Sequence, residues 1–293
     1  MVGANGFIGR HTVRALRRGG TEVLEYTREH PIVTDAGLHV DARAARALVF
    51  VAGSTNPASA ERDPALGASE LAAFERLLDV VAATVQTAGG RLRVVMSGSG
   101  GTVYDPARPP PYGELDPVSP DTAYGRVKLA MEELLRSHDD RLEPVVLRLA
   151  NAFGPGQRIG TGQGVVAHWF QAAASGRPLE LFGDPDTVRD YVYVADVAAA
   201  VVAAVMASHQ LPDVMNVGSG VGTSLGHLGA LVREVVGRRA VDLNIRGARG
   251  FDRSAVVLDI GLARKHLGWV PETSLESGLR ATWAEVGPVT SSR

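Results

Sequence analysis

Short apolar runs alternate with longer amphipathic segments along the chain. Residues 47–52 and 94–96 form continuous apolar runs, and residues 145–149 are apolar except for Arg148. Such runs are typical of strands buried on both faces of a parallel sheet. Residues 69–87 and 124–136 repeat apolar side chains at helical spacing, and Ser69 is the expected N-cap of the first of these segments. Strand followed by helix, repeated, predicts βαβ units with right-handed crossovers. We therefore expect an α/β fold with a doubly wound parallel sheet.

Composition narrows the class of protein. The 293 residues are 45% hydrophobic and 21% charged, which is enough apolar material for a sizeable core. There is no cysteine, so thiolate metal sites and cysteine nucleophiles are excluded, and the histidines lack the spacing of metal ligands. The 30 basic and 32 acidic residues nearly balance, so we expect no nucleic-acid partner. No stretch approaches the roughly 20 apolar residues of a membrane span, and no signal peptide is visible, which predicts a cytoplasmic protein with no membrane partner.

The start of the chain spaces three glycines three residues apart and leads into a helical pattern over residues 10–18. Small residues let the backbone turn tightly, and the free amides of the helix start suit a diphosphate. This arrangement predicts a dinucleotide-binding loop. The residues expected to contact the cofactor there are Gly3, Gly6, Phe7, Ile8 and Gly9. Since only two residues precede the loop, we expect the first strand of the sheet to be truncated.

The second predicted strand, residues 22–27, bears on the choice of cofactor. An acidic residue at the end of this strand would accept hydrogen bonds from the adenosine ribose, but Thr27 and Arg28 stand there instead. A hydroxyl followed by a guanidinium suits a 2′-phosphate better, so the sequence favours NADP over NAD, with Glu25 as the fallback for NAD. Ala52 and Gly53, at the end of the next predicted strand, are also expected to line the cofactor site.

Tyr124 and Lys128 stand four residues apart, on one face of the predicted helix 124–136. The chain has six tyrosines but only two lysines, so the pair is informative. A phenol with its unperturbed pKa of about 10 is a weak base at neutral pH. A neighbouring ammonium favours the phenolate and should lower that pKa. The pair therefore predicts a phenolic general base, and we expect both Tyr124 and Lys128 to contact the cofactor as well.

These features, with several further segments, make the chain similar to one family. The segments that carry the resemblance are the glycine loop, residues 99–104, the pair Tyr124 and Lys128, residues 147–155, residues 189–197, residues 216–220 with Thr223 and Ser224, and residues 267–271. Together they resemble the extended short-chain dehydrogenases/reductases, specifically the NAD-dependent epimerase/dehydratase group that acts on nucleotide sugars. The resemblance covers nearly the whole chain and implies a Rossmann-type sheet with a smaller C-terminal α/β region.

The resemblance also implies a division of the chain. Residues 1–152 and about 187–209 would form the dinucleotide-binding domain. Residues of about 153–186 and 210–293 would form the nucleotide-sugar-binding region. The helices over 69–87 and 124–136 would pair with their symmetry mates in a homodimer.

The resemblance assigns roles to further residues and exposes one departure. The catalytic hydroxyl of the family lies four residues before Tyr104, where this chain has Gly100. Thr102 is the first candidate to replace it, and Ser99 is the second. Because Gly101 and Thr102 stand where the dehydratases carry an acidic pair, dehydration is disfavoured. The resemblance places Asn151, Arg189 and Arg249 at the phosphates or nucleotide of the substrate.

Three functions remain open at this point. The leading hypothesis is a nucleotide-sugar 4-epimerase of the UDP-glucose type, which works through a transient 4-keto sugar. The alternative is an NADPH-dependent 4-ketoreductase acting on a 4-keto-deoxysugar nucleotide. A non-catalytic dinucleotide-binding sensor is the third, and the intact pair of Tyr124 and Lys128 argues against it.

Overall fold

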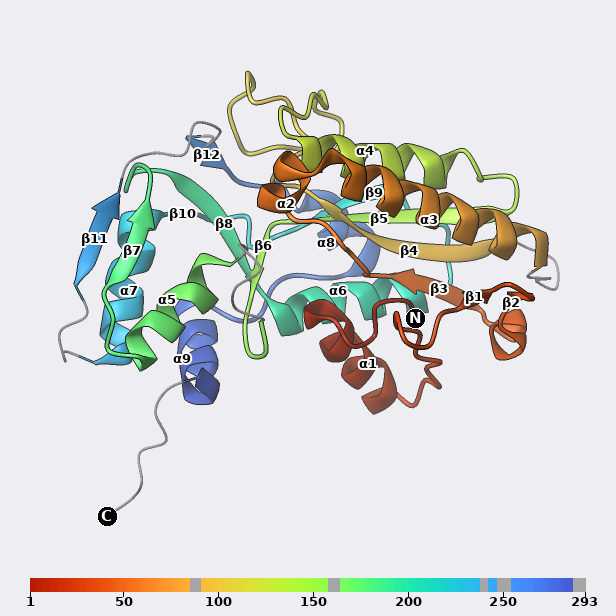
Figure 1. Cartoon of the computed structure of the whole chain (residues 1–293), viewed down its shortest axis with the longest axis horizontal. Coiled ribbons are helices and arrows are strands. Elements are labelled where there is room, and N and C mark those ends of the chain that lie inside the picture. The colour runs from red at the N-terminus through yellow and green to blue at the C-terminus, as the bar shows by residue number, and fades with distance from the viewer. Residues whose placement is uncertain (85–90, 158–163, 238–241, 247–253, 287–293) are drawn as a thin grey trace, which may run out of the picture.

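A parallel sheet with helices on both faces forms the larger part of the molecule (Figure 1). The computed structural model describes residues 1–84, 91–157, 164–237, 242–246 and 254–286. Four strands lie in the order β3-β4-β5-β9, all parallel. Their bounds are Ala47–Phe50 for β3, Leu92–Ser99 for β4, Leu142–Leu149 for β5 and Val214–Val217 for β9. The predicted α/β class and parallel sheet are confirmed.

The sheet continues past β3 through single residues. Val2 bridges Phe50 on one side and Tyr26 on the other, both in parallel. The strand before the glycine loop is therefore very short, as predicted. The expected strand over residues 22–27 is wrong in its extent, since only Tyr26 forms a bridge. The physical reason is that Val2 offers this segment too little backbone to pair with.

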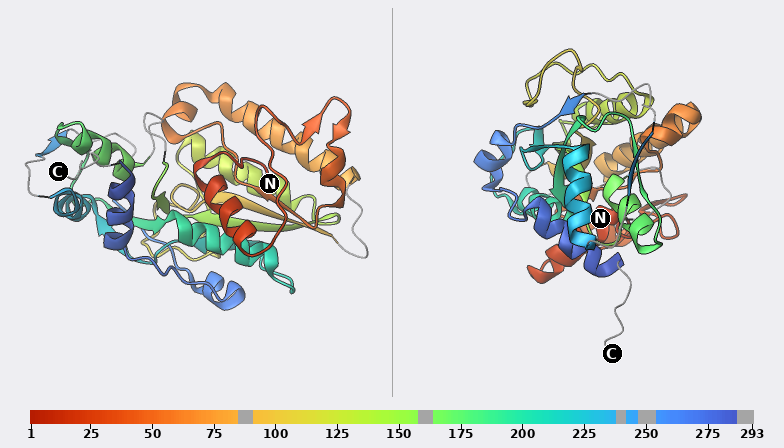
Figure 2. Two further views of the ribbon diagram at one scale, coloured as in Figure 1. Left: turned by 90° about the horizontal axis from the view of Figure 1, so that it is seen from below. Right: turned by 90° about the vertical axis from the view of Figure 1, so that its left-hand side faces the viewer.

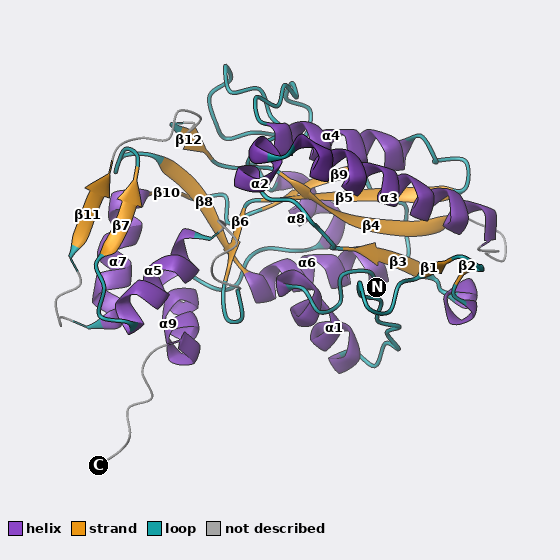
Figure 3. Ribbon diagram, in the orientation of Figure 1, coloured by secondary structure: helices purple, strands orange, loops and turns teal. Residues whose placement is uncertain are grey.

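Two layers of helices cover the sheet (Figure 3). Helices α1 (Phe7–Arg18) and α6 (Val194–Met206) pack together on one face, and α3 (Pro64–Thr84) and α4 (Ala123–Arg136) pack on the other. Helix α3 begins at Pro64, five residues before the expected N-cap Ser69, because proline suits the first turn of a helix. This doubly wound arrangement places the starts of α1 and α4 beside the carboxyl ends of the central strands.

Short elements replace the usual third strand and its helix. The chain between the bridge at Tyr26 and β3 holds the hairpin of β1 (Val33–Thr34) and β2 (Gly37–Leu38) and the 3-10 helix η1 (Val40–Ala44). After β3, the short helix α2 (Pro57–Arg62) begins with Asn56 as its N-cap. Only the β1–β2 hairpin and η1 lie between the bridge at Tyr26 and β3.

The smaller part of the molecule lies beside the carboxyl ends of the central strands (Figure 2). It contains a sheet of order β10-β8-β12, with β6 also paired to β8, and a pair of β7 with β11. Helices α5, α7 and α9 pack on one another around it. The bounds are Asn151–Phe153 (β6), Val165–Ala174 (α5), Leu179–Phe182 (β7), Val188–Tyr193 (β8), Gly222–Ser224 (β10), Leu225–Val236 (α7), Leu243–Arg246 (β11), Ala255–Val256 (β12), Gly261–Leu267 (α8) and Leu275–Val286 (α9).

The expected division of the chain differs from this layout in two details. Strand β9 and helix α8 pack with the central sheet, although residues 210–293 were assigned to the sugar-binding region. Strand β8 belongs to the smaller sheet, although residues 187–209 were assigned to the dinucleotide-binding domain. The chain passes between the central sheet and the smaller sheet more often than the sequence indicates. Within the described ranges, no helix is long and apolar enough to cross a membrane.

A buried ion pair ties α4 to the central sheet. Arg148 on β5 donates from Nη2 to Oε2 of Glu132 over 2.7 Å, and their side chains are 4% and 0% exposed. The guanidinium also lies 4.9 Å from the ring of Tyr104. The Tyr104 hydroxyl donates to Oδ1 of Asn216 on β9 over 2.6 Å. This chain of contacts fixes the end of the 99–104 segment, at Tyr104, relative to α4.

Replacing Glu132 with alanine should destabilise the fold strongly, because it leaves Arg148 buried without its carboxylate. We expect the free energy of unfolding in urea to fall by about 3–5 kcal/mol. Glu133→Ala is the matched control, since Glu133 is exposed on the same helix. It should change that free energy by no more than about 0.5 kcal/mol. Equal effects of the two variants would contradict the assigned importance of the buried pair.

Candidate cofactor and active site

The glycine loop packs directly against the end of β3. Gly3 has φ +86°, and a Cβ there would lie 2.7 Å from the amide nitrogen of Ala52. A Cβ on Gly9 would overlap the carbonyl of Gly3. Both positions therefore require glycine, one for its backbone conformation and one for close approach. The loop and the predicted residue Ala52 are thus brought together.

The start of α1 suits an anionic group. Its N-cap is Gly6, which has no side chain to bond the first amides, and its first turn carries no acidic residue. The amide donors and the positive end of the helix dipole are therefore available to a diphosphate. The expected contacts Phe7 and Ile8 lie in this first turn. These residues fit the diphosphate of a dinucleotide.

Tyr124 and Lys128 lie together on α4, as their spacing predicted. The Lys128 ammonium is 5.5 Å from the centre of the Tyr124 ring. Lys128 is 5% exposed, whereas Tyr124 is partly exposed. A Cβ on Gly53 would lie 3.9 Å from Lys128 Nζ, so the lysine reaches the end of β3 beneath the glycine loop. The pair therefore faces the same edge of the sheet as the cofactor loop.

Glu70 on α3 completes this centre, and the sequence reasoning missed it. Its Oε1 accepts from Lys128 Nζ over 2.8 Å. Its Oε2 accepts from the backbone amides and the hydroxyls of Ser54 and Thr55, at 2.7–3.0 Å. The available signal was its position, because Glu70 interrupts the apolar stripe that continues through Phe74. A carboxylate in such a stripe needs a buried partner.

The folded chain favours the carboxylate form of Glu70 and the ammonium form of Lys128. Burial alone would raise the pKa of Glu70, but Lys128 and the hydrogen bonds from Thr55 and Ser54 outweigh it and lower the pKa to about 2. Burial alone would lower the pKa of Lys128, but Tyr124 and Glu70 raise it above its ordinary value. Lys128 is therefore held as an ammonium at neutral pH, and its orientation is set by Glu70.

Two hydroxyl groups lie near the start of α4. Thr102 Oγ1 donates to Ser99 Oγ over 2.9 Å. The Thr102 carbonyl packs so tightly on α4 that a Cβ on Gly125 would come within 2.6 Å of it. At Gly100 a Cβ would lie 2.5 Å from a methyl carbon of the buried Leu258. The space for a hydroxyl at position 100 is therefore filled, and Ser99 with Thr102 are the hydroxyls this segment offers.

The residues predicted to select the cofactor lie in a turn after the second segment of the sheet. Two hydrogen bonds join Thr27 and His30. The Thr27 amide donates to the His30 carbonyl, and the His30 amide donates to Thr27 Oγ1 over 3.2 Å. Arg28 lies exposed within this turn. Glu25, the fallback for NAD, instead forms an ion pair of 2.6 Å with Arg17 at the end of α1. Thus Arg28 keeps an exposed position from which it could meet a phosphate.

The residues expected at the substrate phosphates lie on adjacent strands of the smaller sheet. Asn151 on β6 pairs in register with Tyr191 on β8, two residues after Arg189. Asn151 Nδ2 donates to the Asp190 carbonyl, and Arg189 Nη1 donates to the Val188 carbonyl. The structure thus brings Asn151 and Arg189 near each other. The third candidate, Arg249, lies outside the described residues.

Comparisons with known proteins agree with this geometry. The model of the family described as "NAD dependent epimerase/dehydratase family" matches residues 1–218. A dTDP-6-deoxy-L-talose 4-dehydrogenase (NAD(P)(+)) of Kitasatospora kifunensis is 31% identical over 97% of this chain and 93% of its own length. A dTDP-4-dehydro-6-deoxyglucose reductase of Escherichia coli is 30% identical over 64% of this chain, which spans only 59% of that relative. The structure of UDP-glucose 4-epimerase from Thermotoga maritima with UDP-glucose has a TM-score of 0.83 and 27% identity, covering 97% of this chain and 96% of that one.

The pKa of Glu70 predicts a specific loss of stability in acid. Because this pKa is lower in the folded chain than in the unfolded one, the ionised carboxylate stabilises the fold above its ordinary value of 4.5. That contribution is lost as the pH falls from 4.5 towards 2. The Glu70→Gln variant should therefore be less stable than the wild type at neutral pH but lose less stability on acidification.

Urea unfolding at about pH 6 and about pH 3.5 measures both quantities. Glu22→Gln is the control, because Glu22 is exposed and lies outside α3 and α4. It should follow the wild type at both values of pH. Should Glu70→Gln lose as much stability as the wild type on acidification, the ionised pair would not be a source of that stability.

Proposed function

Since the chain belongs to the NAD dependent epimerase/dehydratase family, we propose that it is an enzyme that interconverts nucleotide-activated hexoses by 4-epimerisation. The observation that carries this proposal is the Tyr124 phenol beside the buried Lys128 ammonium, at the sheet edge where the glycine loop lies. The similarity to the Thermotoga maritima epimerase over nearly the whole chain supports the same reaction.

The residues at the glycine loop would hold a nicotinamide dinucleotide. Its diphosphate would lie on the uncapped amides of α1, and Gly3, Gly9, Ala52 and Gly53 leave room for close approach. When bound, the nicotinamide supplies the group that takes hydride from C4 of the sugar and returns it. All steps of proton transfer and positioning then fall to side chains of this chain.

Tyr124 would act as the acid and base of the reaction. Its phenolic oxygen takes the proton of the C4 hydroxyl while C4 is oxidised to a ketone, and it gives that proton back when C4 is reduced on the opposite face. The Lys128 ammonium lies beside the Tyr124 ring, and Glu70 holds it in place. Thr102, bonded to Ser99, would hydrogen-bond the C4 oxygen in place of a hydroxyl at position 100.

The nucleotide end of the substrate must stay bound while the 4-keto sugar turns over. Arg189 and Asn151 on the smaller sheet would hold its diphosphate or nucleotide, with Arg249 as a third contact. Because the sugar rotates around this anchored end, these contacts would support turnover as well as affinity.

A second candidate is an NADPH-dependent 4-ketoreductase. The relative from Kitasatospora kifunensis, which aligns over nearly its full length, is named a 4-dehydrogenase that uses NAD(P)(+). The exposed Arg28 after Thr27 suits the 2′-phosphate of NADP. In this reaction Tyr124 would donate a proton to the C4 oxygen as the ketone is reduced.

Product analysis separates the two candidates. With UDP-glucose, an epimerase should form the 4-epimer without net consumption of cofactor, which NMR detects. A ketoreductase should instead oxidise one NADPH for each 4-keto-deoxysugar nucleotide, which absorbance detects. A protein that binds the cofactor and converts neither substrate would contradict both and leave the sensor hypothesis.

Removing the phenol should abolish either activity. We expect Tyr124→Phe to lower kcat by about 10²–10⁴-fold, because the phenolic hydroxyl carries the proton in both reactions. Tyr112→Phe is the control, since that hydroxyl donates to the Arg108 carbonyl. It should retain kcat. Full activity of Tyr124→Phe would remove the assignment.

The homodimer expected from the sequence would form through α3 and α4, which lie side by side on the outer face of the central sheet (Figure 1). Light scattering at micromolar concentration should give twice the mass of the 30.8 kDa chain. Glu75→Arg and Arg76→Glu, on the exposed side of α3, should each shift this towards the monomer. A monomeric wild type would contradict the prediction. The cytoplasmic location remains a prediction.

A further inference from the structure

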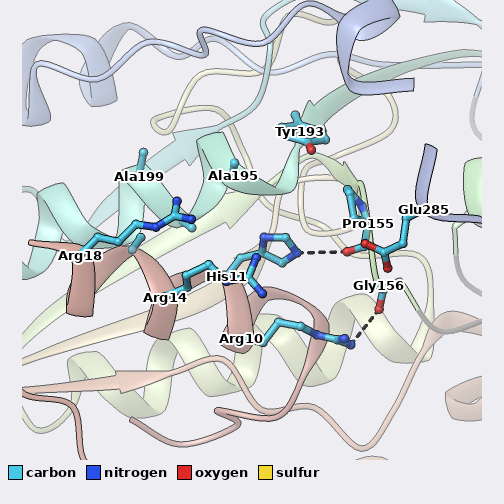
Figure 4. Close-up of a pocket in the computed structure, with 12 residues that line it drawn as sticks. Arg10, His11, Arg14, Arg18, Pro155, Gly156, Tyr193, Ala195, Ala199 and Glu285 are labelled. Atoms are coloured by element: carbon cyan, nitrogen blue, oxygen red, sulfur yellow. Dashed lines mark hydrogen bonds between the residues drawn. The ribbon is translucent and has the colours of Figure 1, made fainter. Parts of the chain in front are cut away.

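A pocket lies between α1, α6 and α9, and none of the residues placed in the candidate active site lines it. Its volume is about 620 Å³, which is in the range of small-molecule sites. Arg10, Arg14 and Arg18 line one wall, and alanines of α6, among them Ala195 and Ala199, line the opposite wall (Figure 4). The small side chains of α6 leave the space that the long arginines border.

The three arginines occupy one face of α1 because they are spaced four residues apart. At 1.5 Å per residue, successive guanidinium positions are separated by about 6 Å along the helix axis. Arg10 is fixed, because its Nη2 donates to the Gly156 carbonyl over 2.8 Å and its Nε to the Gly6 carbonyl over 3.4 Å. Arg14 and Arg18 are exposed. The row therefore has one anchored end and two cations that can turn towards a ligand.

The pocket carries an excess of positive charge. Among the described residues, the pocket is lined by one carboxylate, that of Glu285, and by three guanidinium groups. His11 also lines it and bonds the Pro155 carbonyl over 3.0 Å. Burial lowers the pKa of His11, and the charges of Arg14 and Arg10 lower it further, although the bond to Pro155 acts in the opposite direction. An anion is the ligand that this field favours.

From this geometry we infer that the pocket is a second anion site, which binds a small molecule carrying a diphosphate group. A diphosphate offers two charged phosphoryl groups to guanidinium groups about 6 Å apart along the helix, and each can accept a pair of parallel hydrogen bonds. A single phosphate carries less charge and fewer acceptor oxygens, so the row should bind it more weakly. This inference is independent of the proposed catalytic function, because it uses a different set of residues.

Titration calorimetry with inorganic pyrophosphate tests the site in the full chain. Arg14→Gln and Arg18→Gln should each raise Kd by about five- to tenfold, since each removes one charged hydrogen-bond donor. Glu285→Gln should lower Kd, because it removes the opposing carboxylate. Arg17→Gln is the matched control. Arg17 lies on the same helix but pairs with Glu25 and does not line the pocket, so Kd should stay within about twofold.

The inference is overturned if pyrophosphate does not bind, or if Arg14→Gln and Arg18→Gln leave its Kd unchanged, which would indicate binding at the glycine loop alone. It is also overturned if Arg17→Gln weakens binding as much as Arg14→Gln, which would indicate only the general charge of the helix. A parallel titration with ADP distinguishes a free diphosphate from one carried by a nucleoside. Because the glycine loop offers ADP another site, only the part of its binding that Arg18→Gln weakens belongs to this pocket. If that part is zero while pyrophosphate responds to both variants, the ligand is a free diphosphate.

Discussion

The buried ion pair between Lys128 and Glu70 is the interaction on which the candidate site depends. Moving an ammonium and a carboxylate out of water is costly, and their attraction offsets that cost only when the remaining lone pairs are also bonded. Here Ser54 and Thr55 saturate the second oxygen of Glu70. One carboxylate therefore joins α3, α4 and the end of β3, and leaves the lysine a single orientation beside Tyr124.

The features that could be predicted from the sequence are those set by local geometry. The central residues 94–96 of β4 and 145–147 of β5 are apolar because both faces of the sheet are covered by helices, so these runs identify the strands directly. Tyr124 and Lys128 share a helix face by spacing alone. Glu70 could not be paired with Lys128 in this way, because 58 residues separate them and only the packing of α3 on α4 brings them together. The prediction of a strand over residues 22–27 was wrong in extent for a similar reason. The length of that strand depends on the neighbouring segment, which pairs with it only at Val2.

Several segments that carried the resemblance to the family meet through buried hydrogen bonds. Arg148 from one segment stacks on Tyr104 from another, whose hydroxyl bonds Asn216 from a third. In the same way, Asp196 accepts the indole hydrogen of Trp269 at its carbonyl. These residues hold distant parts of the chain together. Similarity at such positions therefore predicts the fold with more force than it predicts the reaction.

The departure at Gly100 has a structural counterpart that affects the chemistry. The side chain of Leu258 fills the space that a larger residue at position 100 would need. Leu258 belongs to the segment after β12, so the smaller part of the molecule closes this position from outside. Thr102 lies on the same segment as Gly100, and its carbonyl packs against the first turn of α4 at Gly125. Because that turn also carries Tyr124, the segment that bears the replacement hydroxyl and the turn that bears the phenol are in direct contact.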